Sequence, residues 1–413
     1  MNAVMDQLAE RFSGVRSLTE VLAGPLSAED QAAQSMPDAS PTKWHQAHTT
    51  WFFETFILGP NLPGYEPFHP AFGYLFNSYY EAVGARHPRP IRGLLTRPSL
   101  EEVRGYRAHV DASMQRLLGG HIDESTSLLI ELGLHHEQQH QELLLMDIKH
   151  LFSCNPLRPA YRPRRDEAAS RFRPISWKEF QGGVVEIGHQ GVGFAFDNES
   201  PRHHAYLEPY ALADRPVTCG EWLEFIADGG YARAEFWLSE GWNTVAAERW
   251  QAPLYWSMGD DGWEIFTLAG PRQVDPNEPV CHVSLFEADA FARWAGARLP
   301  SETEWESAAA GVPAVGQLLD LDSLHPRSVN DPDSAGLFGD VWEWTSSAYQ
   351  PYPGFATAPG AVGEYNGKFM VNQYVLRGGC CVTPADHVRA TYRNFFPAAS
   401  RWAFSGVRLA KDL

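Results

Sequence analysis

A single helical segment, residues 123–152, constrains the fold of this chain more than any other feature. It contains the run His136-Glu137-Gln138-Gln139-His140, in which two imidazoles stand four residues apart. Side chains at this spacing lie over one another on one face of a helix, so both rings can reach a single metal ion. Imidazole is a ligand for zinc, iron, copper and nickel. Two ligands hold a catalytic metal poorly, so a third ligand is expected from elsewhere in the chain.

His48 is the best candidate for the third ligand. It lies in a segment with helical signals, because Ser40 fits an N-cap position and Pro41 fits the first helical position. Facing helices of a bundle are where metal sites are usually built. We therefore expect a helical bundle with a three-histidine site formed by His48, His136 and His140.

A zinc hydrolase is an alternative interpretation of the same motif. In such enzymes the two histidines of His-Glu-x-x-His bind zinc and the glutamate is the general base. The residues after His140 include neither a Gly turn with a third histidine nor an obvious acidic ligand, although Glu142 is near. Gln139 also places an amide beside the site, which a protease does not require. The hydrolase therefore explains this motif alone.

The composition limits the classes of function. The chain has 413 residues, enough for two domains with their own cores, and a formal net charge of −18, which argues against nucleic-acid or anionic-membrane partners. No apolar run of about 18 residues predicts a membrane span, and the N-terminus lacks the pattern of a signal peptide. Five cysteines without CxxC spacing favour reduced thiols. We expect a cytoplasmic protein that binds small molecules.

The first part of the chain, residues 1–155, has a helical pattern throughout. Ser99 and Glu102 are spaced as a capping box that opens a helix, and Gly119-Gly120 ends it. These signals and the histidine-bearing segment predict an all-α first domain.

The predicted secondary structure changes after a segment rich in proline and arginine. We interpret residues 156–172 as a linker and residues 173–413 as a second domain. Within that domain residues 184–188 alternate like a strand, and residues 219–227 and 285–295 have helical patterns. Short strands, turns and two short helices distinguish this second domain from the helical first part.

Five motifs of the second part occur in a recognisable order. They are Gly-Gly-Val-Val-Glu-Ile-Gly (182–188), Arg-Pro-Val-Thr-Cys-Gly-Glu-Trp (215–222), Arg-Leu-Pro-Ser-Glu-Thr-Glu-Trp-Glu (298–306), Gly-Asp-Val-Trp-Glu-Trp-Thr (339–345) and Leu-Arg-Gly-Gly-Cys (376–380). Together they resemble the formylglycine-generating-enzyme (sulfatase-modifying-factor) domain, which implies a C-type-lectin-like α+β fold. The first part resembles the DinB-like four-helix bundle, whose three-histidine site matches His48, His136 and His140. The multidomain chain is similar to the iron(II)-dependent sulfoxide synthases of ergothioneine biosynthesis, the EgtB family.

This resemblance implies an oxidoreductase that uses Fe(II) and O2 to join a thiol sulfur to the imidazole carbon of hercynine, Nα-trimethylhistidine, as a sulfoxide. In the branch that the chain most resembles, a tyrosine pair lies near the iron, and it matches Tyr79 and Tyr80 within Phe-Asn-Ser-Tyr-Tyr-Glu. A phenol can donate a proton, or a proton and an electron, to a reacting centre. Either tyrosine is therefore a candidate for the catalytic role.

The resemblance also implies contacts with hercynine. Gln139 matches an amide beside an iron ligand that contacts the substrate imidazole. Asn394, Phe395 and Phe396 match the substrate loop of the family. Aromatic faces attract quaternary ammonium groups, so we expect both phenylalanines to form an apolar wall and Asn394 to lie near the carboxylate or ammonium.

Arginine residues are candidates for the thiol substrate, which carries a carboxylate that guanidinium groups bind through two hydrogen bonds. Arg86, Arg89 and Arg92 follow the tyrosine pair at short range, and we favour Arg89 and Arg92. A catalytic site between the two domains is then expected, because domain interfaces are common ligand sites.

Other functions remain open from the sequence. A selenoneine synthase would join a selenium donor to hercynine with the same architecture, and the thiol could be cysteine or γ-glutamylcysteine, with cysteine favoured by analogy. Sulfatase maturation is disfavoured, because the adjacent Cys380 and Cys381 are poorly placed to aim both sulfurs at one copper ion. A non-catalytic lectin-like binding module would explain the second domain but leave the histidines without a role. The sequence predicts no oligomeric state.

Overall fold

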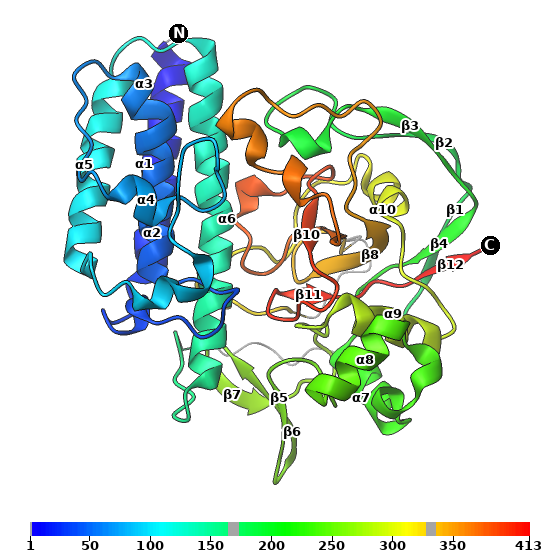
Figure 1. Cartoon of the computed structure of the whole chain (residues 1–413). Coiled ribbons are helices and arrows are strands. Elements are labelled where there is room, and N and C mark those ends of the chain that lie inside the picture. Colours follow the sequence, from blue (N-terminus) through cyan, green and yellow to red (C-terminus); the bar gives the residue numbers. More distant parts are fainter. Residues whose placement is uncertain (1, 164–172, 328–335) are drawn as a thin grey trace. The chain divides into compact units, whose positions relative to one another are not determined.

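The chain forms two compact units in a computed structural model that describes residues 2–163, 173–327 and 336–413 (Figure 1). The first unit comprises Met1–Tyr161 with Ala358–Tyr365, and the second comprises Arg162–Thr357 with Asn366–Leu413. The assignment of residues 358–365 to the first unit was not expected from the sequence.

The expected linker, residues 156–172, lies partly outside the described residues, because residues 164–172 are not among them. The boundaries of the two expected domains therefore stay predictions. Within the described part of the chain, no helix has the length and apolar character needed to cross a membrane.

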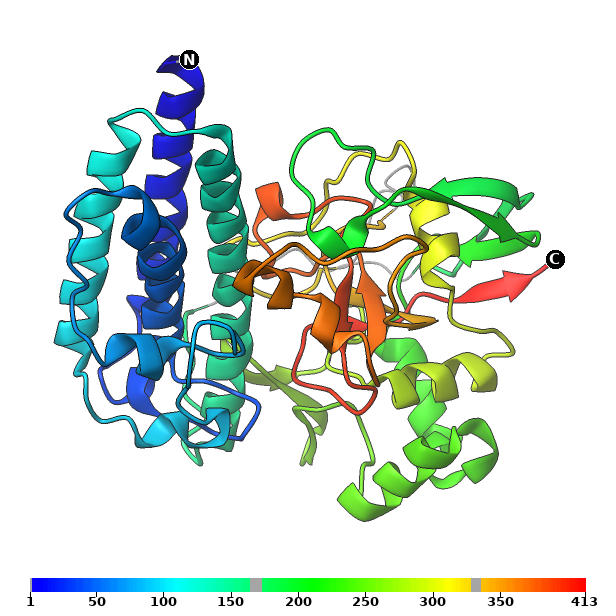
Figure 2. The ribbon, with the colours of Figure 1, turned by 45° about the horizontal axis from the view of Figure 1, so that its top comes forward.

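The first unit is helical, as predicted (Figures 1 and 2). Its long helices are α1 (Asn2–Ala23), α2 (Thr42–Phe52), α5 (Leu100–Leu118) and α6 (Glu124–Cys154), and its shorter pieces include a π-helical turn (Phe53–Leu58), α3 (Gly59–Asn61), α4 (Phe72–Phe76) and a 3-10 turn (Arg89–Leu94). Helix α2 contacts both α5 and α6, and α1 contacts α6. Figure 2 shows these long helices side by side, so that α2 faces the histidine-bearing α6.

Local capping explains where α5 and α6 begin. The Ser99 hydroxyl accepts a hydrogen bond from the backbone of Glu102 at 3.2 Å, and the Glu102 carboxylate accepts one from the backbone of Ser99 at 2.7 Å. The predicted capping box is thus confirmed, and α5 ends at Gly119 as expected. Asp123 caps α6 by accepting from the backbone N–H of Thr126 at 2.7 Å.

The predicted start of α2 was wrong by one residue. Pro41, and not Ser40, occupies the N-cap position, and the helix begins at Thr42. Ser40 makes other contacts: its backbone N–H donates to Asp147 at 2.7 Å, and its hydroxyl accepts from Arg92 at 3.0 Å. Asp147 and Arg92 are distant from Ser40 in the sequence. The residues around Ser40 therefore could not indicate that it makes these tertiary contacts instead of capping α2.

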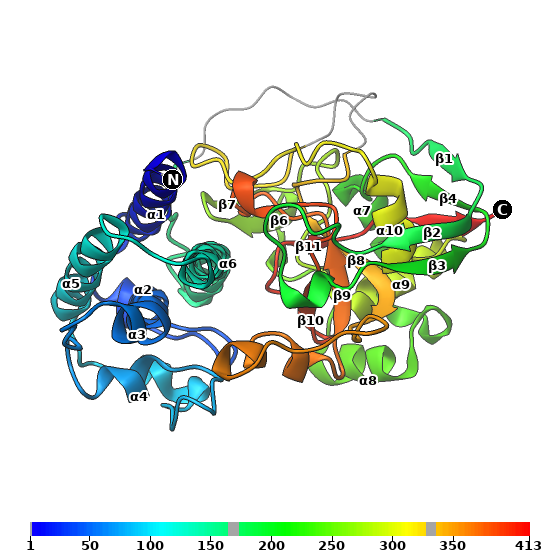
Figure 3. The same ribbon diagram turned by 90° about the horizontal axis from the view of Figure 1, so that it is seen from above.

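The second unit combines small sheets with helices (Figure 3). Its strands are β1 (Trp177–Phe180), β2 (Gly183–Ile187), β3 (His203–Leu207), β4 (Tyr210–Ala213), β5 (Trp256–Gly259), β6 (Gly262–Thr267), β7 (Gly270–Gln273), β8 (Trp342–Ala348), β9 (Tyr374–Arg377), β10 (Asn394–Phe396), β11 (Ser405–Gly406) and β12 (Ala410–Asp412). They pair in the orders β1-β4-β12, β10-β9-β8-β11, β2-β3 and β5-β6-β7, and β11 runs parallel to β8. Strand β10 therefore forms an edge of its sheet.

The two predicted helices of this unit are confirmed as α7 (Cys219–Ala227) and α9 (Leu285–Trp294). Two further helices, α8 (Ser239–Glu248) and α10 (Glu302–Ala309), were not predicted from the sequence. Helix α10 does carry a local signal, because the Ser301 hydroxyl accepts from the backbone of Glu304 at 3.1 Å in a capping box.

Charged residues of the recognisable motifs pair in the interior of this unit. Arg408 binds Glu343 through two nitrogens at 2.8 and 2.6 Å, and Trp305 donates to the same carboxylate at 2.6 Å. Arg393 binds Glu302 at 3.0 Å through two nitrogens, directly before β10. Buried charges require such partners, so these motif residues stabilise the fold and fix the start of β10.

Candidate metal centre

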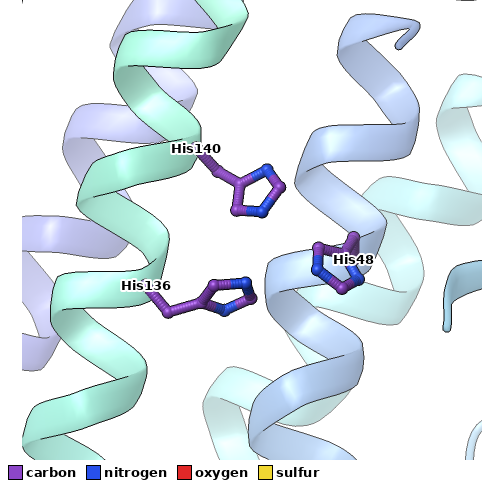
Figure 4. A group of neighbouring side chains, drawn as sticks. All are labelled: His48, His136 and His140. Atoms are coloured by element: carbon purple, nitrogen blue, oxygen red, sulfur yellow. The ribbon is translucent and has the colours of Figure 1, made fainter. Parts of the chain in front are cut away.

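Three histidines from two helices meet inside the first unit (Figure 4). His48 projects from α2, and His136 and His140 project from α6 toward it. One nitrogen of each ring lies within 4.8 Å of a nitrogen of each of the others. Two nitrogens that share an ion at about 2.1 Å lie at most about 4.2 Å apart, so a bound metal requires only a small closure of the rings.

Burial keeps these rings neutral. Removal from water lowers the pKa of His48 and of His140 well below the ordinary value, and the neighbouring histidines lower both further. The pKa of His136 falls to about 3 for the same reason, its burial. Neutral imidazole is the form that offers a lone pair to a metal, so the site is ready to bind a cation at neutral pH.

Unpaired nitrogens also fit a metal site. The Nδ1 of His48 lies 2.6 Å from the carbonyl oxygen of Phe76 and therefore carries the proton, which leaves a lone pair on Nε2. Within the described residues this Nε2 and both ring nitrogens of His136 are buried without a hydrogen-bond partner. Buried polar atoms are nearly always paired, so these nitrogens fit metal ligands.

Aromatic stacking holds the ring of His48. It lies between Trp44, at 4.6 Å between ring centroids and 13° between planes, and Trp51, at 5.5 Å and 16°. The guanidinium carbon of Arg92 lies 3.3 Å from the centroid of the Trp44 ring. The stack restricts rotation of His48 and brings one positive charge near the site.

Glu137, the glutamate of the His-Glu-x-x-His motif, is bound to other residues. Its carboxylate accepts from Arg16 at 2.8 Å, from Thr19 at 2.7 Å and from Arg107 at 3.1 Å. Burial alone would raise the pKa of Glu137, but the charges of Arg16 and Arg107 hold it below the ordinary value. A carboxylate paired with two arginines is a poor base, which removes the main support for a zinc hydrolase.

The tyrosine pair packs on aromatic residues that themselves contact the histidines. Tyr80 is buried, and its ring packs 5.6 Å from Trp51 and 5.1 Å from Phe56. Half-buried Tyr79 lies 4.7 Å from Tyr80 between centroids. Burial, and then the neighbouring phenol, raises the pKa of Tyr80 well above its ordinary value, so it keeps its proton at neutral pH.

Tyr365, which lies in the segment 358–365 of the first unit, was not predicted as a site residue. Its ring is 5.6 Å from His136 and 6.2 Å from Tyr79, and its hydroxyl donates to the amide oxygen of Gln139. Glu364, the residue before Tyr365, accepts hydrogen bonds on its carboxylate from the backbone N–H groups of residues 81 and 82 at 3.1 and 2.8 Å. No local pattern signals a contact across so many residues.

The three candidate arginines differ in their surroundings. Arg86 and Arg89 are exposed, and their guanidinium groups donate to backbone carbonyls of Ser78 and Asp38. Arg92 is only 4% exposed, and no ion pair to a carboxylate is found for it within the described parts of the chain. Burial, and then the charges of Arg89 and Arg86, lowers the pKa of Arg92 to about 8.

The other predicted substrate residues lie in the second unit. Asn394, Phe395 and Phe396 form strand β10 rather than the expected loop, because they pair with β9. Phe395 stacks on Tyr349 at 4.0 Å, whereas Phe396 packs 5.6 Å from Trp402. Successive side chains of a strand face opposite sides, so Phe395 and Phe396 pack on different neighbours, and their role in one wall stays a prediction.

Comparison with known proteins places these features in context. A family model for the sulfatase-modifying factor enzyme 1-like domain matches residues 179–320 and 322–413. The hercynine oxygenase of Mycobacterium tuberculosis is 32% identical over 99% of both chains. That of Mycolicibacterium thermoresistibile is 33% identical over 91% of this chain and 88% of its own. Ergothioneine biosynthesis protein 1 of Schizosaccharomyces pombe is 25% identical over 53% of this chain and 28% of its own.

Proposed function

The chain belongs to the hercynine oxygenase family, and on this premise we propose that it is a sulfoxide synthase of ergothioneine biosynthesis. The enzyme joins a thiol to the imidazole carbon of hercynine with O2 and forms a C–S bond. The observation that supports this most strongly is the set of neutral histidines His48, His136 and His140, of which the first two are buried and the third is half-buried. We assign the first unit as a DinB-like four-helix bundle, the second as a C-type-lectin-like domain, and the location as cytoplasmic.

We assign iron(II) to the nitrogens of His48, His136 and His140. When bound there, iron(II) supplies the redox chemistry that O2 activation needs, and three protein ligands leave positions for substrates. The chain contributes neutral ligands, a stack of tryptophans around His48, and the burial of His48 and His136. These features hold the ligand geometry before substrates bind.

Phenols beside the histidines supply protons in this proposal. Tyr80 keeps its proton because burial raises the pKa of its phenol. Tyr79 and Tyr365 are the other candidates, and the hydroxyl of Tyr365 orients the amide of Gln139 beside the ligand His140. We assign Gln139 to the hercynine imidazole, and Tyr80 to the proton-donating role ahead of the other two.

Arg92 is the candidate for the carboxylate of the thiol donor. Its charge is buried, and an incoming carboxylate would supply an ion pair that the described residues do not provide. A charge-assisted pair of this kind fixes the orientation of the donor. Arg86 and Arg89 already donate to backbone carbonyls at the surface, so we place them behind Arg92.

For hercynine we keep Asn394 and Phe395 as candidates in the second unit. Phe395 stacks on Tyr349, at 4.0 Å between centroids, and also contacts Phe369, at 6.0 Å. Such a group of aromatic rings is the kind of surface that attracts a trimethylammonium ion. Phe396 faces the opposite side of β10 and becomes the weaker candidate.

Oxygen consumption separates this function from that of a zinc hydrolase. Metal-free protein is loaded with Fe(II) or with Zn(II) and mixed with hercynine and a thiol in an oxygen-electrode cell. We expect O2 uptake that requires Fe(II), hercynine and the thiol together. No uptake with Fe(II) bound, or equal behaviour with Zn(II), would contradict the proposal. A selenium donor in place of the thiol tests the selenoneine alternative in the same cell.

A further inference from the structure

Two side chains other than the three candidate ligands, those of Asp147 and His45, form a hydrogen-bonded series that ends at His140. The Nδ1 of His45, on α2, lies 2.8 Å from the Nδ1 of His140. On its other side, the Nε2 of His45 lies 3.0 Å from a carboxylate oxygen of Asp147, on α6. Both His45 and Asp147 are buried, and Ser40 holds the same carboxylate oxygen through its backbone N–H at 2.7 Å.

The carboxylate determines where the protons of both rings lie. An ionised carboxylate only accepts hydrogen bonds, so the Nε2 of His45 carries a proton. A neutral His45 then has a bare Nδ1 that accepts, and the Nδ1 of His140 must be the donor. The neutral ring of His140 is left with its lone pair on Nε2. If His45 were a cation, the order would reverse and the Nε2 of His140 would carry a proton.

We propose that Asp147 and His45 are positioning residues, which fix the tautomer of His140 so that its Nε2 is a metal ligand. The inference rests on the proposed function in that it takes His48, His136 and His140 as the ligand set. Partners of this kind orient metal-bound histidines and strengthen their binding. His48 is held in a comparable way by the carbonyl of Phe76, at 2.6 Å. In the case of His140, a histidine stands between ligand and carboxylate.

The tautomers can be read directly from metal-free protein. Histidine labelled with 15N gives two-dimensional NMR patterns that distinguish Nδ1–H from Nε2–H rings, with signals assigned by His45→Gln and His140→Gln variants. We expect an Nδ1–H tautomer for His140 and an Nε2–H tautomer for His45. An Nε2–H tautomer of His140, or a doubly protonated His45, would overturn the proposal. Neither iron nor substrate is needed, so this outcome is independent of the proposed enzyme function.

Metal affinity tests the consequence, with Co(II) alone as the probe. Asp147→Asn is compared with Glu54→Gln as a control. Asp147 and Glu54 are carboxylates of the same unit and are each 6% exposed. Glu54 instead accepts hydrogen bonds from the phenols of Tyr65 and Tyr106. An amide can accept or donate, so it no longer dictates the tautomer. We expect about 10- to 100-fold weaker Co(II) binding for Asp147→Asn and shifted visible bands of the bound cobalt. Equal losses in both variants would show a structural effect and contradict the proposal.

His45 offers a rescue experiment. A glutamine at this position can accept from His140 and donate to Asp147, whereas a leucine can do neither. We therefore expect His45→Gln to retain most of the Co(II) affinity and His45→Leu to lose it, at similar urea midpoints of the metal-free proteins. If His45→Leu binds Co(II) as tightly as the wild type, the positioning role is wrong. The tautomer measurement on wild-type protein decides the case in which His45→Leu does not fold.

Discussion

Neighbouring residues at positions 136 and 137 have opposite roles, because helix geometry turns successive side chains by about 100°. His136 faces the other histidines, whereas Glu137 faces Arg16 and Arg107. The spacing within the motif was sufficient to predict the histidine pair. The pairing of Glu137 with arginines was not predictable, because its partners lie on other helices and no local pattern indicates them.

Replacing Glu137 tests this division. Glu137→Gln leaves two buried guanidinium groups without their shared carboxylate, so we expect a loss of about 3–5 kcal/mol in the free energy of unfolding. The folded fraction of Glu137→Gln should bind iron and form product at the wild-type rate. Urea unfolding and a product assay measure the two effects. Lost turnover at unchanged stability would instead support a role as a base.

Removing His48 tests the ligand set. His48→Ala leaves two histidines, and we expect the protein to stay folded but to lose its iron on desalting, because two ligands hold the ion poorly. The matched control is His135→Ala, since His135 is a buried histidine of the same unit that lies on α6 and contacts Arg11 at 2.8 Å. Iron content by mass spectrometry should fall only in the first variant. Full iron content in His48→Ala would remove it from the site.

Phenylalanine substitutions identify the phenol that acts in the reaction. We expect Tyr80→Phe to lower sulfoxide formation by about 10²- to 10⁴-fold with iron still bound, the usual range for a lost general acid. Tyr79→Phe and Tyr365→Phe serve as comparisons, because both rings lie in the same aromatic group. Product yield is measured by liquid chromatography. An unchanged yield in Tyr80→Phe would move the role to one of the others.

At the scale of elements, local signals predicted α5, α6, α7 and α9, because capping and periodicity are encoded in adjacent residues. Strand β10 was expected as a loop, since its conformation depends on pairing with β9, which lies earlier in the chain. The same limit applies to the segment 358–365, whose contacts with the first unit are entirely non-local.

The 3-10 turn over Arg89–Leu94 points one arginine inward and another outward, which offers a matched pair of variants. Arg92→Met removes the buried charge, so we expect the KM for the thiol to rise by about 10- to 100-fold, as for a lost charge-assisted hydrogen bond. The KM for hercynine should change little. Arg89→Met, at the exposed position, is the control. Steady-state kinetics with each substrate varied in turn measure both KM values. An equal change in the KM for the thiol in both variants would contradict the assignment.

For the molecule as a whole, the sequence signals divide between the two units. The ordered motifs of the second unit mainly build interior pairs such as Arg408 with Glu343, and they predicted its fold class. The residues assigned to metal chemistry lie in the first unit and were predicted from helix spacing and the family resemblance. Contacts such as those of His45, Asp147 and Tyr365 require the folded chain and were missed.

The stability of the second unit should depend on pH through Glu278. Burial alone would raise the pKa of this carboxyl, but His325 and Arg272 lower it from 4.5 to about 2. A depressed pKa gives stability that is complete above about pH 4.5 and is lost as the pH falls toward 2. The difference in unfolding free energy between wild type and Glu278→Gln should therefore shrink by about 3 kcal/mol over this range. Urea unfolding followed by tryptophan fluorescence measures it, and a constant difference would contradict the prediction.

The most direct test of the central claim is product analysis. Protein loaded with Fe(II) is incubated in air with hercynine and, separately, with cysteine, γ-glutamylcysteine or a selenium donor, and the products are identified by mass spectrometry. The account predicts a hercynyl sulfoxide with one thiol, absent when O2 is withheld. An adduct formed only with the selenium donor, or no adduct at all despite bound iron, would contradict it.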